Sequence, residues 1–175
     1  MTDNLGKLKN LQSLTIDTCG LTEIPSLHDL KKLTSLSLPN NQLSDVQGLF
    51  NVSQIFLYQN QFTALPSQTH PRSLRIIYMN YNPVQHFPNV ALYSNLTEVR
   101  FAQTQISTIP SNIDELKKLS FLDLSFTKLT TVPNSILKVP RLQFLVIQGN
   151  TFSTDEVTKI KNEFSTERPE VQLLI

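Results

Sequence analysis

The chain has 175 residues, and its 15 Lys and Arg residues nearly balance its 14 Asp and Glu residues, leaving a formal net charge of +1. That balance provides no basic field for nucleic acid or an anionic membrane surface, so those partners are disfavoured. The single cysteine, Cys19, excludes an intramolecular disulfide framework and a multi-cysteine zinc site, and no run of about 18 apolar residues is present to span a membrane.

One pattern, L-x-x-L-x-L-x-x-N-x-L, recurs along the chain, for example as "LTSLSLPNNQL" from Leu33 and "LRIIYMNYNPV" from Leu74. Its copies begin near residues 11, 33, 52, 74, 96, 119 and 142. In five copies an apolar residue and a proline follow at the same offset, giving Pro25, Pro66, Pro88, Pro110 and Pro133. A repeat of about 22 residues predicts short units that each supply one strand and stack into a solenoid.

The eleven positions of the pattern, called slots here, divide into an inward and an outward set. We expect slots one, four, six and eleven to point inward, because one repeat cannot cover its own apolar face. The ninth slot holds Cys19, Asn41, Asn60, Asn82, Thr104, Thr127 and Asn150. An inward asparagine can satisfy turning backbone that no regular ladder pairs, and Cys19 is predicted to be a buried structural thiol of the same row, with a reactive thiol as the alternative.

The chain after the last repeat predicts a C-terminal cap over residues 153–175. Ser153 and Glu156 form a capping-box pattern, and the apolar residues that follow at helical spacing predict an amphipathic helix from about Thr154 to Phe164. Pro169 should end this region, and "VQLLI" can add an edge strand. "LGKLKNL" before Leu11 matches only the return half of a repeat, so we expect that an upstream cap, signal or further repeat precedes the chain.

The outward slots two, three, five, seven and eight should form a solvent-facing surface, and seven of the fourteen aromatic residues (4 Tyr and 10 Phe) occupy them. The first two repeats contribute none of these rings, so the surface is polar at its N-terminal end and aromatic from the third repeat onward. The candidate protein-binding residues are Phe56, Tyr58, Ile76, Tyr78, Tyr81, Glu98, Arg100, Phe121, Asp123, Phe126 and Phe144.

Two interpretations of this surface stay open. Exposed aromatic patches mark interaction sites. Glu98, Arg100 and Asp123 could orient a partner, because they lie between two expected aromatic groups: Phe56, Tyr58, Tyr78 and Tyr81 in one, and Phe121, Phe126 and Phe144 in the other. The alternative is that the rings only pack against one another across adjacent strands. An enzymatic function is not expected, because His28, His70 and His86 fall on returns or loops without matching carboxylates and no catalytic motif, metal site or cofactor site is recognisable.

These repeats, the proline-containing returns and the terminal helix followed by "VQLLI" resemble leucine-rich-repeat proteins over about residues 5–175, most closely bacterial members of the internalin type. The resemblance implies one α/β repeat domain over residues 1–175: a right-handed solenoid with a concave parallel β-sheet, irregular or 3-10 convex returns and a C-terminal helix cap. It also implies a non-enzymatic module that binds another protein through its concave face.

By the same resemblance, the partner would be a host cell-surface protein, such as an adhesion receptor of the cadherin class, and the protein would be secreted or displayed on the bacterial surface. Two alternatives remain. One is an intracellular, cytoplasmic scaffold or regulatory subunit, and the other is the recognition domain of a larger enzyme.

Overall fold

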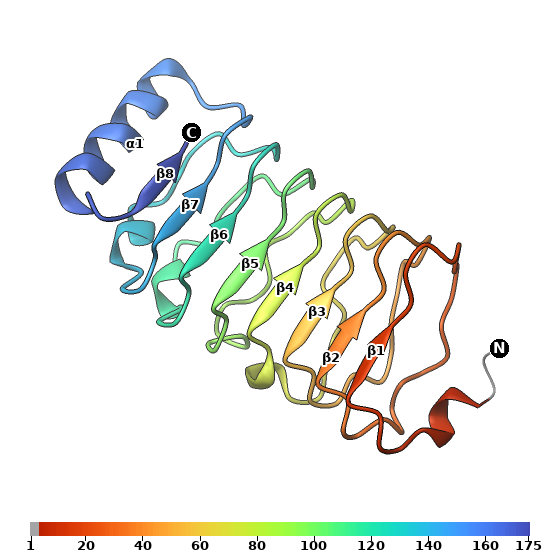
Figure 1. Cartoon of the computed structure of the whole chain (residues 1–175). Helices are drawn as coiled ribbons and strands as arrows, with labels where there is room; N and C mark the ends of the chain where they lie inside the picture. The colour runs from red at the N-terminus through yellow and green to blue at the C-terminus, as the bar shows by residue number, and fades with distance from the viewer. Residues whose placement is uncertain (1–3) are drawn as a thin grey trace.

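The computed structural model describes residues 4–175, which form one continuous parallel sheet of eight short strands. The strands lie side by side in chain order (Figure 1). They are β1 (Ser13–Thr15), β2 (Ser35–Ser37), β3 (Gln54–Phe56), β4 (Ile76–Tyr78), β5 (Glu98–Arg100), β6 (Phe121–Asp123), β7 (Phe144–Val146) and β8 (Gln172–Leu174).

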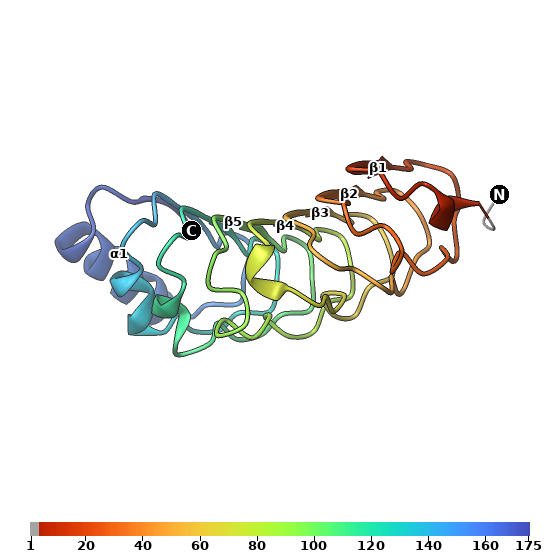
Figure 2. The ribbon, with the colours of Figure 1, turned by 90° about the horizontal axis from the view of Figure 1, so that it is seen from below.

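The returns between strands are irregular, with short 3-10 turns in four places: η1 (Leu5–Lys7), η2 (Pro71–Ser73), η3 (Ile113–Glu115) and η4 (Asn134–Lys138). Figure 2 shows the strands along one long side of the molecule and the returns along the other, with the row of strands bending gently. The predicted solenoid with one strand per repeat is confirmed, and in the seven repeats the strands occupy slots three to five.

The core is a row of stacked apolar side chains. The slot-four residues of neighbouring strands lie in register, so that Ile55 lies beside Ile77 and Leu122 beside Leu145. All four of these side chains are fully buried. Because every repeat contributes the same slots, the core runs the length of the solenoid and the sheet forms one of its sides. Outward side chains of neighbouring repeats are therefore separated by the strand spacing of about 4.8 Å.

The ninth-slot asparagines join each coil to the one before it. In the Asn82 side chain, Oδ1 accepts a hydrogen bond from Phe62 N at 2.9 Å, while Nδ2 donates to the carbonyls of Leu57 at 2.8 Å and Met79 at 3.1 Å. The amide therefore satisfies backbone groups of the previous coil and of its own turn. Asn41, Asn60 and Asn150 repeat this arrangement.

The predicted burial of Cys19 is wrong. Its side chain is exposed, and its Sγ donates a hydrogen bond to the carbonyl of Asp17, at 3.1 Å, within its own turn. The reason is its place in the stack: a ninth-slot side chain is buried by the preceding coil, and β1 is the edge strand of the sheet in residues 4–175. Cys19 is hydrogen-bonded to the asparagine row through its backbone N–H, which donates to Asn41 Oδ1.

The cap covers the other end of the stack. Helix α1 (Thr154–Glu167) runs three residues further than predicted, and it buries Ile160 and Phe164 against the last coil. Ser153 Oγ accepts from Glu156 N as a capping residue should, but the Glu156 carboxylate accepts from Val132 N instead of completing the capping box. The Arg168 guanidinium then donates to the carbonyls of three residues of the last return: Leu137, Val139 and Leu142.

Burial is graded along the solenoid. Inward side chains of the first coil, including Leu11, Leu14 and Ile16, are only partly buried, whereas their equivalents in the second to seventh coils are buried. The two ends of the stack are therefore unequal: one ends in a helix and an added strand, and the other in a half-covered coil.

Replacing Asn82 with alanine should lower the free energy of unfolding by roughly 2–5 kcal/mol, because Phe62 N–H and the Leu57 carbonyl would be left buried without partners. Chemical denaturation measures the change. Asn51→Ala, at an exposed position, is the control and should stay within about 0.5 kcal/mol of the parent protein. Equal effects of the two changes would contradict the role assigned to the ninth slot.

Cys19 should react with a thiol reagent in the folded protein nearly as fast as in denaturant, because its sulfur is exposed. The measurement compares the two rates of modification with a chromogenic disulfide reagent at one pH. Protection of a hundredfold or more in the native protein would show that the first coil is covered in solution.

Candidate functional site

Four aromatic rings and one arginine from slots three and five form a single connected row across the sheet, called here the aromatic ladder. Each position is supplied by a different strand, so parallel register brings the side chains together. The ladder consists of Phe56, Tyr78, Arg100, Phe121 and Phe144.

The ladder consists of a ring pair at each end and two cation–π contacts between them. The rings of Phe56 and Tyr78 meet edge to face with centroids 5.0 Å apart, and those of Phe121 and Phe144 are tilted with centroids 5.5 Å apart. Between the pairs, the Arg100 guanidinium carbon lies 4.7 Å from the Tyr78 ring centroid and 4.4 Å from that of Phe121. Each such contact stabilises by about 0.5–1.5 kcal/mol, so the row behaves as one unit.

Glu98 fixes the centre of the ladder. One carboxylate oxygen, Oε1, accepts hydrogen bonds from the Tyr78 hydroxyl at 2.5 Å and from Arg100 Nε at 2.7 Å, and the Arg100 terminal nitrogen lies 2.6 Å away. Burial, and then the hydrogen bond to Glu98, raise the pKa of the Tyr78 phenol above its ordinary value. Tyr78 is therefore a neutral donor at physiological pH, and the charge of Arg100 is compensated within the site.

Asp123 lies beside Arg100 in register but is not paired with it. Its Oδ1 accepts hydrogen bonds from the backbone N–H of Ser125 at 2.9 Å and from the Ser125 hydroxyl at 2.7 Å. Among residues 4–175, no Lys, Arg or His side chain lies within 4.0 Å of this carboxylate. The carboxylate is thus held in one orientation by neutral donors.

The eighth slots form a second feature, the rim, along the edge of the sheet where the strands end. Every rim residue has a left-handed backbone, with φ between 52° and 70°: Thr18, Asn40, Gln59, Tyr81, Gln103, Phe126 and Gly149. This conformation is uncommon for bulky side chains. It is held here by the next coil, since the backbone N–H of each rim residue through Phe126 donates to a seventh-slot carbonyl, as Tyr81 does to Ala102 at 3.0 Å.

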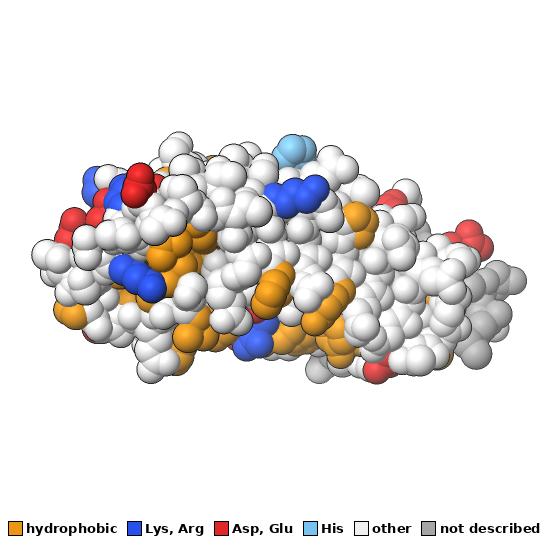
Figure 3. All heavy atoms as spheres, turned by 90° about the horizontal axis from the view of Figure 1, so that it is seen from above, with side chains coloured by type: hydrophobic (Ala, Val, Ile, Leu, Met, Phe, Trp, Pro, Cys, Tyr) orange, Lys and Arg blue, Asp and Glu red, His pale blue; other side chains and the backbone are white. Residues whose placement is uncertain are grey.

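Two rim aromatics are the most exposed rings of the candidate site. Tyr81 is 53% exposed and Phe126 is 52% exposed, whereas the ladder rings are half-buried. Figure 3 views the molecule from this side and shows hydrophobic side chains as separate islands in a surface that is mostly uncharged. The Phe126 ring also explains Gly149, because a Cβ there would lie 2.4 Å from Phe126 Cδ1.

The N-terminal repeats present a polar surface, as predicted. Ser13, Thr15, Ser35 and Ser37 occupy the positions equivalent to the ladder. Hydrogen bonds to Asp17 from Asn40 and then from Thr18 lower the pKa of its carboxyl group, so it remains ionised.

The structure brings most of the predicted site residues together but changes their grouping. Tyr58 and Ile76 are half-buried beside the ladder. Phe126 was expected to join Phe121 and Phe144, yet its ring lies on Gly149 at the rim. The outward slots are also less open than expected.

Four outward-slot residues are in fact buried: Pro39, Ala102, Ser125 and Val146. The first three occupy the seventh slot, where the chain turns away from the sheet. No pattern of residue types in the sequence marks that turn or the left-handed rim beyond Asn40 and Gly149, which are residues that favour positive φ.

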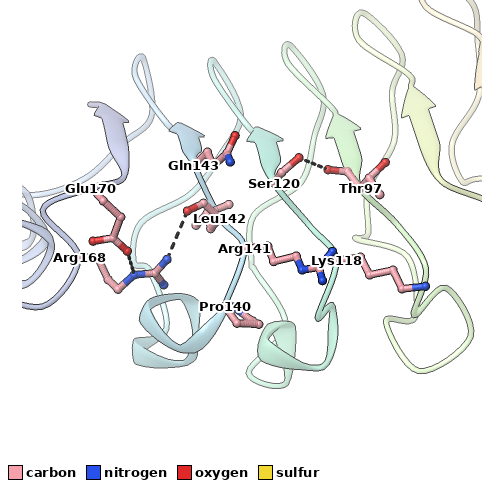
Figure 4. Close-up of a pocket in the computed structure, with 9 residues that line it drawn as sticks. All are labelled: Thr97, Lys118, Ser120, Pro140, Arg141, Leu142, Gln143, Arg168 and Glu170. Carbon is pink, nitrogen blue, oxygen red and sulfur yellow. Dashed lines mark hydrogen bonds and ion pairs between the residues drawn. The ribbon is translucent and has the colours of Figure 1, made fainter.

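A separate hollow of about 570 Å³ lies at the opposite edge, where strands β5 to β8 begin (Figure 4). Its basic groups are mostly engaged: Arg168 binds return carbonyls and Glu170, and Lys118 donates to Asn95 at 2.7 Å. Of the lining residues, Arg168 and Glu170 belong to the cap.

Catalytic chemistry has no visible framework within residues 4–175. No group of three or more His, Cys, Asp or Glu residues there could hold a metal ion. His28 faces Asp29 and the His70 ring packs against Phe50. The helices of the same described region are also too short or too polar for any of them to cross a bilayer.

No family model matches the chain, but single proteins do. Disease resistance protein UNI of Arabidopsis thaliana is 29% identical over 116 residues, which cover 61% of this chain and 13% of that protein. Fibromodulin of Oryctolagus cuniculus is 35% identical over 72 residues, covering 40% of this chain and 48% of that protein. The chain therefore spans less than half the length of these curated relatives.

Solved structures match over more of the chain. An LRR protein of Leptospira interrogans superposes with a TM-score of 0.74 at 22% identity, covering 97% of this chain and 50% of that one. A second structure is the LRR ectodomain of the Arabidopsis thaliana receptor kinase GASSHO1/SCHENGEN3, solved in complex with CASPARIAN STRIP INTEGRITY FACTOR 2. It gives a TM-score of 0.69 at 25% identity, and the match covers 85% of this chain and 20% of that one.

Replacing Tyr81 with asparagine should leave the free energy of unfolding unchanged or raise it by up to about 1 kcal/mol, because asparagine adopts a left-handed backbone more easily. Tyr78→Asn, in a strand, is the matched control and should destabilise by about 2 kcal/mol through lost ring and hydrogen-bond contacts. The stabilities of the two variants are compared through their midpoints of denaturant unfolding. Equal destabilisation would mean that Tyr81 packs like a strand residue.

Proposed function

Because the chain is a leucine-rich-repeat protein, we propose that it is a non-enzymatic module that binds another protein through the aromatic ladder and the adjoining rim. One observation carries this proposal: two exposed aromatic side chains, Tyr81 and Phe126, are kept in a strained backbone conformation where smaller residues would fit better. Strain retained at exposed positions is characteristic of functional sites.

The ladder supports the same proposal in a second way. Its half-buried rings are already fixed by their neighbours, so a partner would lose little side-chain entropy when it covers them. Mutual packing of the rings, the alternative to a binding role, is real but incomplete, because every ladder residue remains partly accessible. A rigid aromatic floor beside an exposed aromatic rim is the composition typical of binding hot spots.

In its finer form, the proposal is that the protein is a secreted or surface-exposed bacterial factor whose partner is a host adhesion receptor of the cadherin class. This form rests on the resemblance to internalin-type proteins. The similarity to the LRR ectodomain of a plant membrane receptor kinase supports an extracellular location. The alternatives are an intracellular scaffold or regulatory subunit and the recognition domain of a larger enzyme.

The test is a titration of the parent and two variants against purified adhesion-receptor ectodomains, cadherins first. Phe121→Ala and Phe126→Ala should each weaken binding by about 2 kcal/mol, or roughly thirtyfold, if these rings are anchors. Circular dichroism checks that both variants remain folded.

Ser35→Ala serves as the control, because Ser35 lies on the same face at the polar end and should change affinity less than twofold. Binding that is unaffected by both phenylalanine changes would place the partner elsewhere on the solenoid. A panel in which no cadherin binds, but another receptor binds through the two phenylalanines, would reject the cadherin assignment and retain the concave site.

A further inference from the structure

We propose that Asp123 is the specificity position of this surface and receives a basic side chain, Lys or Arg, from the protein partner. The inference rests on the proposed function, since it names the chemistry of the partner at the same site. It follows from three features of Asp123: its missing cation, its fixed orientation and its apolar surroundings.

The first feature is an uncompensated charge. Within slots three, five, seven and eight, Arg100 is the single cation, and its guanidinium is bound to Glu98 and stacked between Tyr78 and Phe121. These contacts draw it along its own strand toward Glu98 and away from Asp123, its neighbour in register. Over these four slots the aromatic half of the surface therefore carries one net negative charge, at Asp123, and Arg75 of the second slot does not lie within 4.0 Å of that carboxylate.

The second feature is pre-organisation. Both hydrogen bonds from Ser125 reach Oδ1, so within residues 4–175 the other carboxylate oxygen, Oδ2, has no hydrogen-bond partner. Ser125 itself is buried, which keeps the donors in place. A carboxylate that is already oriented binds a cation without the entropy loss that weakens most surface ion pairs.

The third feature is the surface next to the carboxylate. Phe121 lies two residues before Asp123 on the same strand and pairs with Phe144, and both rings are partly accessible, whereas Val146, in register beside Asp123, is buried. Lys and Arg carry an aliphatic stem below their charged head, and such stems pack on apolar and aromatic surfaces. The carboxylate therefore matches the charged head of a basic side chain, and the adjacent rings match its aliphatic stem. A neutral polar residue would lack this combination.

The experiment selects ligands from a phage library of disulfide-cyclised random heptapeptides on the immobilised parent protein. The recovered peptides are then measured against Asp123→Asn, Phe121→Ala and Asp17→Asn. Asp17→Asn is matched in charge and lies five strand spacings away, roughly 24 Å, which is beyond the reach of a cyclic heptapeptide.

The expected result is that peptides sensitive to Phe121→Ala are enriched in Lys or Arg, lose about tenfold in affinity on Asp123→Asn, and are unchanged on Asp17→Asn. Their affinity should also fall as salt rises. Peptides that need Phe121 but tolerate Asp123→Asn, or that show no basic enrichment, would overturn the inference and leave the proposed binding surface intact. Peptides indifferent to Phe121 and Asp123 alike would reject both.

Discussion

The solenoid depends on one constraint: the turn after each strand has backbone groups that only the neighbouring coil can satisfy. Ninth-slot asparagines meet this need from one side, as Asn82 does for Phe62 and Leu57. Rim N–H groups meet it from the other, by donating to the next coil. Stacking is therefore directional and in register, and it fixes the spacing of every outward side chain before any partner is present.

The candidate site results from that spacing. Slot five brings Tyr78, Arg100 and Asp123 into consecutive register positions, and slot three adds Glu98 and Phe121. At this separation Arg100 can reach two rings and one carboxylate together, and the contacts to Glu98 leave Asp123 without a cation. A regular backbone thus produces an irregular distribution of charge, which is what distinguishes one repeat protein from another as a binding surface.

The sequence predicted the features that depend on slot identity: the strands, the buried leucine rows, the asparagine row and the cap. It could not predict features that depend on a residue's neighbours. Cys19 occupies the right slot but no coil precedes its own within residues 4–175, and Val146 occupies an outward slot but is covered. The position of Phe126 follows from the left-handed rim, most of whose residue types, such as Thr18 and Tyr81 but not Asn40 or Gly149, do not favour positive φ.

The graded burial along the stack has a mechanical consequence. Each coil is held mainly by its two neighbours, so resistance to pulling is set by the weakest junction rather than by the whole core. The first coil has partly exposed leucines and one neighbour in the described residues, whereas the last is clamped by α1, β8 and Arg168. Tension should therefore peel coils from the β1 end one at a time, and the aromatic repeats, which lie nearer the clamp, would keep their geometry until late in the process.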